Sequence, residues 1–334
     1  MIRHRHLGGV ALGPLGFGGA PLGNLYAAID EDEAIGAVRR AWDLGIRHFD
    51  TAPHYGHGLS EHRLGEILRR RPRDEFVLST KVGRLLTPDA SAPAAQHGFA
   101  ATLPFAQHFD YSADGARRSL EDSLQRLGLA RIDIAYVHDC DAHAHGADAP
   151  AAFRAAMEGA LPALARLKEE GAVGAIGLGV NAWQTCRDAL AHADIDLFLL
   201  AGRYTLLDQS SLDALLPLCV ARGTGIVIGG PYNSGILASG AVAGARYDYE
   251  PAPPAILERV RAIEAACARH RVPLKAAALQ FPLAHPAVVA AIPGARNPAE
   301  VDENLALVRH PIPAAFWAEL RSTQLLRPDA PVPG

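Results

Sequence analysis

The fold is decided by residues 45–65, which read GIRHFDTAPHYGHGLSEHRLG. A short apolar run ends at Asp50, and a loop that carries Tyr55 and several glycines leads to a helical pattern from Ser60. This order predicts a strand, a loop and a helix, with a carboxylate at the end of the strand and a phenol just beyond it. A tyrosine has a pKa near ~10, so it exchanges protons at neutral pH only if a cation or a hydrogen bond stabilises the phenolate. A cation from elsewhere in the chain is therefore needed for Tyr55 to act.

The composition is that of an ordinary globular protein, with 49% hydrophobic and 20% charged residues among 334. A formal net charge of −4 indicates neither a nucleic-acid nor a membrane partner. No apolar run reaches the ~18 residues of a membrane helix, and residues 1–6 lack the apolar core of a signal peptide. We therefore expect a cytoplasmic protein. The four cysteines form no CxxC pair, which predicts free and mostly buried thiols.

Apolar runs and helical patterns alternate along the whole chain. We predict strands over 15–19, 46–50, 76–82, 132–138, 173–180, 197–201, 225–229 and 288–292. We predict helices from residue 30 onward and over 60–70, 113–127, 153–170, 182–192, 210–222, 253–270, 273–284, 298–309 and 313–324. The strands are continuous apolar runs, which is typical of a parallel sheet that is buried on both faces. Eight such strands alternating with helices predict an α/β protein with a (β/α)8 TIM barrel, in a single domain over residues 1–334.

A doubly wound open sheet is the alternative fold. It usually binds dinucleotides through a GxGxxG fingerprint, and here Gly16 and Gly18 are followed by Pro21 at the third position. The fingerprint therefore fails, which favours the barrel. Two long irregular segments, 84–111 and 140–150, are either lids that close over a substrate or surface insertions.

Three chemically active side chains come at the ends of consecutive predicted strands: Asp50, Lys81 and His138. Active sites of such barrels lie at the carboxyl ends of the strands, and adjacent strands are ~4.8 Å apart. We therefore expect these side chains to meet at one rim with Tyr55. Lys81 would lower the pKa of Tyr55, Asp50 would fix Lys81, and His138 would hydrogen-bond a substrate oxygen. A phenol so placed can exchange a proton with a carbonyl or hydroxyl group while a hydride leaves or arrives at carbon.

Other residues on this face allow several interpretations. The run His138-Asp-Cys-Asp-Ala-His-Ala-His145 resembles a metal site, but metal ligands in such barrels come from different strand ends, so we predict no metal. His54 is predicted to contact the substrate together with Tyr55 and His138. Phe17, Trp183 and Tyr232 either shape the same pocket or pack in the core.

Over nearly its whole length, the sequence resembles the aldo-keto reductase superfamily. The resemblance rests on residues 45–56, 79–81, 137–138 and 292–304. It implies that Asp50, Tyr55, Lys81 and His138 form a catalytic tetrad, and that a nicotinamide nucleotide binds without a Rossmann fold.

A finer resemblance, carried by residues 109–112, 137–139 and 229–235, is to bacterial aldose and L-fucose dehydrogenases and the related pyridoxal 4-dehydrogenases. It implies oxidation of the anomeric hydroxyl of a small sugar to a lactone, with hydride transfer to NAD(P)+. Pyridoxal 4-dehydrogenase activity and general aldehyde or ketone reduction are the alternatives. A nucleotide-sensing regulatory subunit is the alternative from another class.

The resemblance also implies where the nucleotide binds. In many members the fifth strand ends in Ser-Asn, whereas here Gly179 and Val180 stand there and Asn181 follows. The sixth strand often has Gln and the seventh often has Tyr; this chain has Ala201 and Gly229 at those two positions. The expected cofactor contacts are Asn181, Gly229, Pro231, Asn233, Ser234, Gly235, Gly294, Arg296, Glu303 and Asn304.

The choice between NAD and NADP depends on residues 292–304. NADP-binding members commonly place Lys right after Ile-Pro and Arg six residues later, where this chain has Gly294 and Glu300. A carboxylate repels the ribose phosphate of NADP, although Arg296 offers one compensating charge. We therefore predict that NAD is favoured over NADP.

Overall fold

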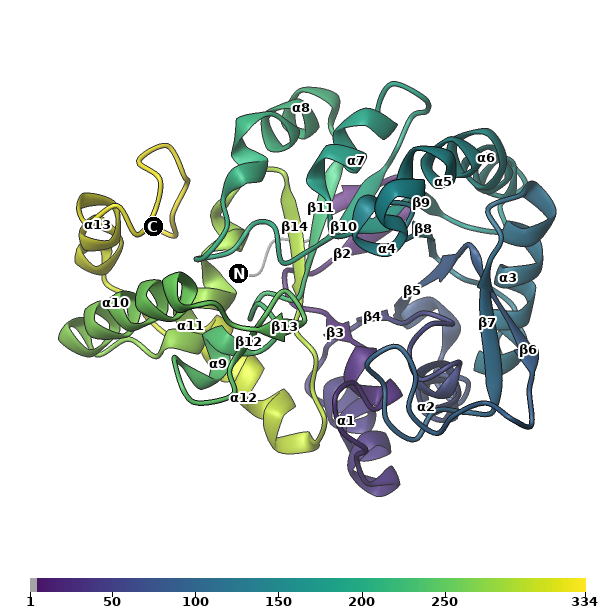
Figure 1. Ribbon diagram of the computed structural model, residues 1–334, viewed down its shortest axis with the longest axis horizontal. Coiled ribbons are helices and arrows are strands. Elements are labelled where there is room, and N and C mark those ends of the chain that lie inside the picture. The colour runs from purple at the N-terminus through teal and green to yellow at the C-terminus, as the bar shows by residue number, and fades with distance from the viewer. Residues whose placement is uncertain (1–4) are drawn as a thin grey trace.

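Eight parallel strands form a barrel inside a ring of helices in the computed structural model, which describes residues 5–334 (Figure 1). In their order around the sheet the strands are β3 (Phe17–Gly18), β4 (His48–Asp50), β5 (Val77–Val82), β8 (Ile134–His138), β9 (Ala175–Val180), β10 (Leu197–Ala201), β11 (Gly225–Gly229) and β14 (Val288–Ile292). The backbone N–H of Gly16 donates to the carbonyl of Ala291 at 3.0 Å, and Gly18 bridges Gly294, so the first and last strands meet. The predicted TIM barrel is confirmed, and the open sheet is excluded.

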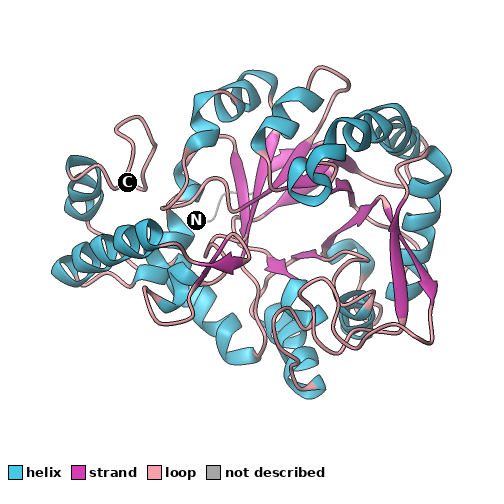
Figure 2. Ribbon diagram, viewed as in Figure 1, coloured by secondary structure: helices cyan, strands magenta, loops and turns pink. Residues whose placement is uncertain are grey.

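Helices cover the outside of the barrel (Figure 2). They are α1 (Glu31–Asp43), α2 (Leu59–Leu68), α3 (Ala113–Leu127), α4 (Ala142–His145), α5 (Ala149–Ala155), α6 (Leu161–Glu169), α7 (Trp183–Ala189), α8 (Leu215–Arg222), α9 (Ile236–Ser239), α10 (Pro254–His270), α11 (Leu274–Gln280), α12 (Pro298–Val308) and α13 (Ala314–Ser322). Among the described residues, no helix combines the length and the apolar character needed to cross a membrane. The prediction that the chain opens without a signal peptide falls mainly on residues 1–4, which lie outside the described range.

Some predicted helices have different bounds in the structure. The helix predicted over 153–170 begins at Ala149, with Pro150 in its first turn, and a π-helical turn over Ala156–Ala160 joins α5 to α6. Proline is well suited to the first turn of a helix, because the N–H that it lacks has no helical partner there. The helix predicted over 210–222 is a 3₁₀ turn, Ser210–Asp213, followed by α8.

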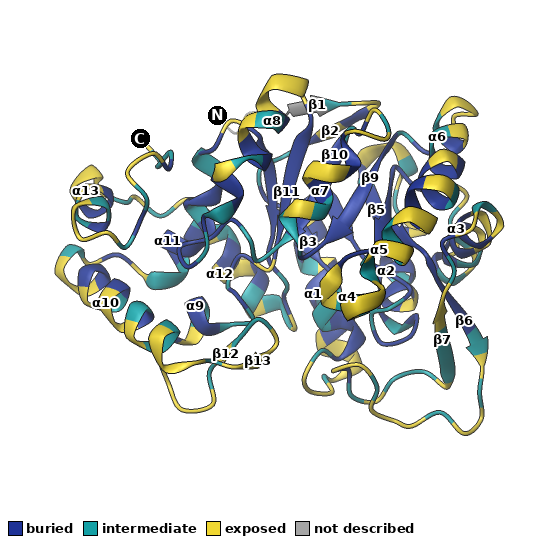
Figure 3. Cartoon of the chain, turned by 45° about the horizontal axis from the view of Figure 1, so that its top comes forward, coloured by how far each residue is buried: buried dark blue, intermediate teal, exposed yellow. Residues whose placement is uncertain are grey.

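The segment predicted to be irregular, 84–111, contains an antiparallel hairpin of β6 (Arg84–Pro88) and β7 (Phe105–Phe109). The prediction of an irregular segment was wrong because the pairing partners are separated by a long loop, and no local pattern announces them. The hairpin stands at the edge of the barrel and is less buried than the barrel strands (Figure 3). Only Gly83 separates its first residue, Arg84, from the end of β5.

Two short hairpins lie at the ends of the barrel. One consists of β1 (Arg5–Leu7) and β2 (Val10–Leu12), and the N–H of Gly9 in its turn donates to the carbonyl of Gly174 at 3.1 Å. Val10 and Leu12 pack with the side chains inside the barrel, so this hairpin closes the end where the strands begin. The other consists of β12 (Arg246–Tyr247) and β13 (Glu250–Pro251), in the segment that follows β11.

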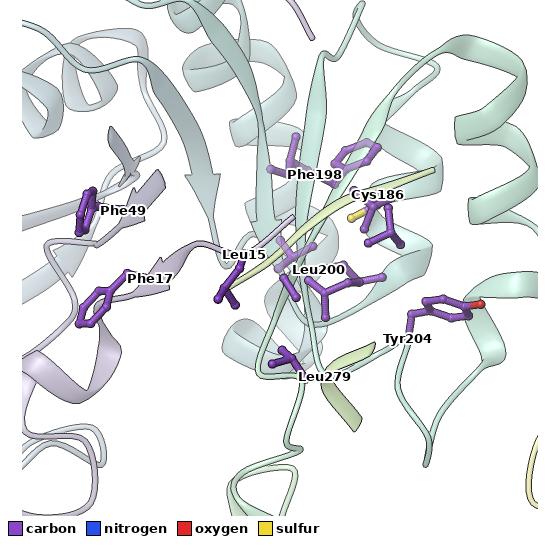
Figure 4. Close-up of a cluster of buried hydrophobic side chains, with 14 of the residues drawn as sticks. Leu15, Phe17, Phe49, Cys186, Phe198, Leu200, Tyr204 and Leu279 are labelled. Atoms are coloured by element: carbon purple, nitrogen blue, oxygen red, sulfur yellow. The ribbon is translucent and has the colours of Figure 1, made fainter. Parts of the chain in front are cut away.

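Alternate side chains of each strand belong to two separate apolar cores. On β10, Leu197 and Leu199 face the barrel interior, whereas Phe198 and Leu200 pack outward against the helices. Figure 4 shows part of this outer core, in which Cys186 is also buried. The four cysteines are free and buried, as predicted. This alternation decides which side chains at the strand ends face into the barrel.

The contact between β9 and β10 generates a prediction for stability. A methyl group at Gly177 would lie 1.7 Å from the carbonyl oxygen of Leu197, so the two strands would have to move apart. We expect Gly177→Ala to lower the free energy of unfolding by about 3 kcal/mol, as measured by urea denaturation. Gly9→Ala is the control, because the atom nearest its added methyl group is 3.5 Å away. Equal stability of the two variants would contradict the described strand packing.

Candidate active site

Three strands bring Asp50, Lys81 and His138 to the inside of the barrel at its carboxyl end. Successive side chains of a strand point to opposite faces. Tyr136 lies in the interior core, so His138, two residues later on β8, faces inward as well. The exposed fractions are 1% for Asp50, 1% for Lys81 and 6% for His138.

Asp50 and Lys81 form a buried ion pair. The Nζ atom of Lys81 is 2.7 Å from Oδ2 of Asp50 and donates a second hydrogen bond, of 2.8 Å, to the carbonyl of Thr51. The hydroxyl of Ser79 donates to Oδ1 of Asp50 at 2.7 Å. Removing two charges from water is costly, and the additional hydrogen bonds offset part of this cost. The predicted pairing of Asp50 with Lys81 is present in the structure.

Tyr55 lies against this pair, and its ring centre is 4.6 Å from Nζ of Lys81. An ammonium group has three donors, and the two hydrogen bonds described above leave one of them for Tyr55. Burial raises the pKa of Tyr55 well above its ordinary value, and the negative charges of Asp50 and Asp139 act in the same direction. The net shift is opposite to the lowering that the sequence analysis expected, because sequence alone does not reveal how deeply the phenol is buried; the effect of Lys81 itself stays a prediction. Tyr55 is a neutral phenol at neutral pH.

Two histidines face Tyr55. The rings of His138 and Tyr55 are 6.1 Å apart, and those of His138 and His54 are 5.9 Å apart. Burial lowers the pKa of both histidines well below the ordinary value; Lys81 and Arg84 lower the pKa of His138 further, and Arg84 lowers that of His54. Both imidazoles are therefore neutral at neutral pH and able to donate or accept a hydrogen bond. The three residues predicted to contact the substrate lie together.

A glycine provides the space for Lys81. An added Cβ at Gly179 of β9 would lie 3.4 Å from Cε of Lys81, in ordinary van der Waals contact, so a side chain larger than that of alanine would press on the lysine stem. Gly179 occupies a position where the resembling family often has a polar side chain. This departure in the sequence thus has a steric role in the structure.

Asn181, which follows β9, is held by two contacts. Its backbone N–H donates to Oδ2 of Asp141 at 2.9 Å, and its side-chain Nδ2 donates to the hydroxyl of Tyr249 at 3.3 Å. Tyr249 comes from the turn of the β12–β13 hairpin, which therefore reaches across to the end of β9. No pattern in the sequence pointed to Tyr249, because its hairpin is short and its residues show no alternation of apolar and polar side chains.

The last residue of β11 and the loop after it supply five of the predicted cofactor contacts: Gly229, Pro231, Asn233, Ser234 and Gly235. Nδ2 of Asn233 donates to the carbonyl of Gly202 at 3.0 Å, and its Oδ1 is buried without a partner among residues 5–334. The hydroxyl of Ser234 accepts the N–H of Tyr249 at 2.9 Å. A buried oxygen without a partner is uncommon in proteins and fits a donor from a bound ligand. The loop therefore fits the nucleotide that the resemblance implies.

The remaining predicted cofactor contacts surround the start of α12. Nδ2 of Asn304 is 3.4 Å from the carbonyl of Gly294, and its Oδ1 accepts the hydroxyl of Tyr232 at 2.8 Å. Glu303 forms an ion pair with Lys275 at 2.8 Å. Gly294 and Asn304 lie together, as the prediction requires.

Arg296 does not present the free positive charge that was expected of it. Its guanidinium is 2.6 Å from Oε1 of Glu300, and its backbone N–H donates to Oε2 of the same carboxylate at 2.8 Å. The arginine that was expected to compensate for Glu300 is thus paired with it. The pair leaves little free positive charge at this position.

Three residues near the tetrad were missed by the sequence analysis. Nη2 of Arg84 is 2.6 Å from Oδ2 of Asp139, and Oε1 of Gln107 is 3.0 Å from Nδ1 of His54. Asp139 follows His138 directly, so its place after a strand end was a usable signal. Arg84 and Gln107 lie in the hairpin that was predicted to be irregular.

The candidate pocket aromatics have other contacts. Phe17 is buried in the outer core, where its ring centre is 6.0 Å from that of Phe49, so it does not line the site (Figure 4). Nε1 of Trp183 donates to the hydroxyl of Ser210 at 3.0 Å. Tyr232 bonds Asn304, as described above.

The side chains of the run from His138 to His145 contact different partners. Nε2 of His145 is 3.0 Å from the hydroxyl of Tyr111, and the ring of His143 is 5.3 Å from that of Tyr249. Within the described part of the chain, no three His, Cys, Asp or Glu side chains are grouped so as to hold a metal ion.

A hollow of about 670 Å³ opens at the opposite end of the barrel, between Val10, Val77 and Leu305. It contains none of the four tetrad residues. Active sites of barrels of this kind lie at the carboxyl ends of the strands, so we assign the candidate site to the tetrad and not to this hollow.

Comparisons with known proteins agree with this geometry. The model of the Aldo/keto reductase family matches residues 14–324. Pyridoxal 4-dehydrogenase of Microbacterium luteolum is 44% identical over 328 residues, which are 95% of this chain and 96% of that protein. D-threo-aldose 1-dehydrogenase of Pseudomonas sp is 42% identical over 323 residues, again 95% of this chain and 96% of that protein.

Solved structures show the same architecture. An aldo-keto reductase from Bacillus halodurans, in its holo form, has a TM-score of 0.75 over 98% of this chain and 97% of its own. The sequences are 24% identical, so this likeness concerns the fold alone. The fold predicted from the sequence is thus found in a solved relative.

Buried His48 generates a prediction for pH dependence. Its Nε2 lies 3.5 Å from the Ser79 hydroxyl, and burial together with Lys81 lowers its pKa from 6.5 to about 4. Between these values the unfolded chain binds a proton that the folded protein does not, so stability falls as pH falls. The free energy of unfolding should fall when the pH is lowered from 6 to 5, and this fall should be about 1 kcal/mol smaller in His48→Gln than in the wild type. Urea denaturation at both pH values measures this; an unchanged loss would contradict the assignment.

Proposed function

The chain belongs to the aldo/keto reductase family, and from this premise we propose that it oxidises the anomeric hydroxyl of an L-fucose-like aldose to a lactone with NAD+. The observation that carries the proposal is the buried Asp50–Lys81 pair against the ring of Tyr55, with the neutral His138 facing it. The relative named D-threo-aldose 1-dehydrogenase supports a sugar as the substrate.

We assign the proton transfer to Tyr55. His138 would donate a hydrogen bond to the reacting oxygen and hold it beside the phenol. Lys81, fixed by Asp50, would stabilise the Tyr55 phenolate through its remaining donor. Because Tyr55 is a neutral phenol in the unliganded protein, it would first release its own proton to solvent. The sugar hydroxyl would then give its proton to the resulting phenolate while the C–H electron pair leaves the same carbon as hydride. When bound, NAD+ supplies the hydride acceptor; Asn181, Asn233 and Asn304 are among the residues that would hold it.

Pyridoxal is a second candidate substrate, because the relative from Microbacterium luteolum is named for it. The aldehyde of pyridoxal and its neighbouring hydroxymethyl group can close to a cyclic hemiacetal. That hemiacetal presents the same kind of hydroxyl as a cyclic sugar, so the same four residues would perform the same chemistry. General aldehyde reduction is less favoured, since cells keep NAD mostly oxidised.

The NAD preference that we propose is supported by the contacts of Arg296. Its pairing with Glu300 neutralises a cation that would otherwise attract the additional phosphate of NADP. A cytoplasmic location is part of the proposal, and the free, buried state of all four cysteines is consistent with a reducing compartment.

The first test of the function is NADH formation with L-fucose, D-arabinose, L-galactose, D-galactose and pyridoxal. We expect turnover with at least one sugar, and Tyr55→Phe to lower kcat at least ~100-fold because the proton acceptor is lost. The dissociation constant of NAD+, measured by fluorescence quenching, should stay unchanged.

Tyr204→Phe is the matched control, because the Tyr204 hydroxyl is buried without a partner in the described part of the chain. Near wild-type activity of Tyr55→Phe would refute the assignment of Tyr55. Tight nucleotide binding without turnover on any of the five compounds would favour a nucleotide-sensing subunit instead.

The nucleotide preference has its own test. We expect Glu300→Gln to free Arg296 and to raise kcat/KM for NADP+, relative to that for NAD+, about tenfold. Steady-state rates with both nucleotides measure the ratio. Asp302→Asn on the same helix is the control, since Asp302 pairs with Arg40 instead. A wild-type enzyme that prefers NADP+ would contradict the proposed NAD preference.

A further inference from the structure

A second ion pair lies beside the tetrad and has no part in the proton transfer. Arg84, at the start of β6, and Asp139, directly after β8, are joined at 2.6 Å, with exposed side-chain fractions of 8% and 15%. The pair is close enough to the tetrad that both charges act on Tyr55. Gln107, on the strand paired with β6, is linked through His54 to the same side of the site.

Asp139 is turned toward the site by its backbone. Its φ of 50° is in the left-handed region, which is uncommon for residues other than glycine and is found more often in functional sites. The same residue donates its N–H to the carbonyl of Gly179 at 3.0 Å, which fixes this turn. Its Oδ2 lies 3.4 Å from Nε2 of His138. The carboxylate is therefore held next to the atom that would bind the reacting oxygen.

Stability alone gives no reason for these groups to be there. A buried ion pair often contributes little net stability because desolvation cancels its attraction. Nε of Arg84 and Nε2 of Gln107 are moreover buried without hydrogen-bond partners among residues 5–334. A buried donor that lacks a partner destabilises the folded protein. A wall with one carboxylate and several donors matches the hydroxyl groups of a sugar, each of which both donates and accepts.

We propose that Asp139, positioned by Arg84, binds the hydroxyl on the carbon next to the anomeric carbon and so selects cyclic sugars with a free 2-hydroxyl. This inference rests on the proposed function, because it names the substrate class of the same site. If His138 holds the anomeric oxygen, the 2-hydroxyl is the sugar hydroxyl nearest to it, and Asp139 offers an acceptor 3.4 Å from Nε2 of His138. Gln107 is placed to donate to a hydroxyl farther round the ring.

The test compares each sugar of the panel with its 2-deoxy analogue. A site built to hydrogen-bond a substrate hydroxyl rejects the analogue that lacks it, because the site's own polar group is then left unpaired. We expect wild-type kcat/KM to be at least ~100-fold higher for the complete sugar. In Asp139→Ala the two values should become nearly equal. Both substrates are measured with the same enzyme, so a loss of folded protein cancels from the ratio.

Arg84 is tested as a positioning residue. Arg84→Lys should retain most of the discrimination because it keeps a cation beside Asp139, whereas Arg84→Met should lose it. Asp89→Asn is the control for loss of a carboxylate: Asp89 lies in the loop between β6 and β7, where it bonds Ser91. It should leave the ratio unchanged.

The outcomes separate the two proposals. Oxidation of sugars with equal rates for the 2-deoxy analogues, or an unchanged ratio in Asp139→Ala, overturns the role of Asp139 and leaves the dehydrogenase function standing. Oxidation of pyridoxal and of no sugar, or of none of these compounds, overturns the sugar function and this inference together.

Discussion

The ion pair between Lys81 and Asp50 sets the demands that the rest of the site meets. Two opposite charges that are 2.7 Å apart and almost wholly buried need further hydrogen bonds to offset their desolvation. Ser79 and the carbonyl of Thr51 supply two of them, and the register of β4 against β5 places Asp50 opposite Ser79. Gly179 leaves room for the lysine stem. The strand register, the glycine at position 179 and the hydrogen bonds thus all help to accommodate the ion pair between Lys81 and Asp50.

The surroundings of the pair keep other groups uncharged. Burial lowers the pKa of His48 and His138 and raises that of Tyr55, so each of these residues is neutral near pH 7. In such a site a single added charge acts strongly, because little water screens it. The proton on Tyr55 is consequently sensitive to what binds nearby. Arg84 and Asp139 add a second pair, whose place at the rim suits recognition better than proton transfer.

The fold and the meeting of Asp50, Lys81 and His138 at one rim could be predicted because their signals are local. An apolar run followed by a carboxylate or an ammonium group marks a strand end, and barrel topology then brings Asp50, Lys81 and His138 together. Arg84 and Gln107 could not be predicted in this way, since the strands that carry them pair across a long loop. The pKa of Tyr55 is raised where the sequence analysis expected it to be lowered, and the reason is related. Burial comes from packing by distant segments, which no stretch of sequence around Tyr55 contains.

The closure of the barrel has a consequence for synthesis on the ribosome. The N–H of Gly16 bonds the carbonyl of Ala291, so the strand made first is paired on both sides only after nearly the whole chain exists. At ribosomal speeds this delay is on the order of tens of seconds. During that time β3 has an open edge, and the segments with Asp50 and Lys81 are made long before the barrel that excludes water from them is closed. A nascent chain of this kind therefore has a long period in which an exposed strand edge is open to wrong partners and to chaperones.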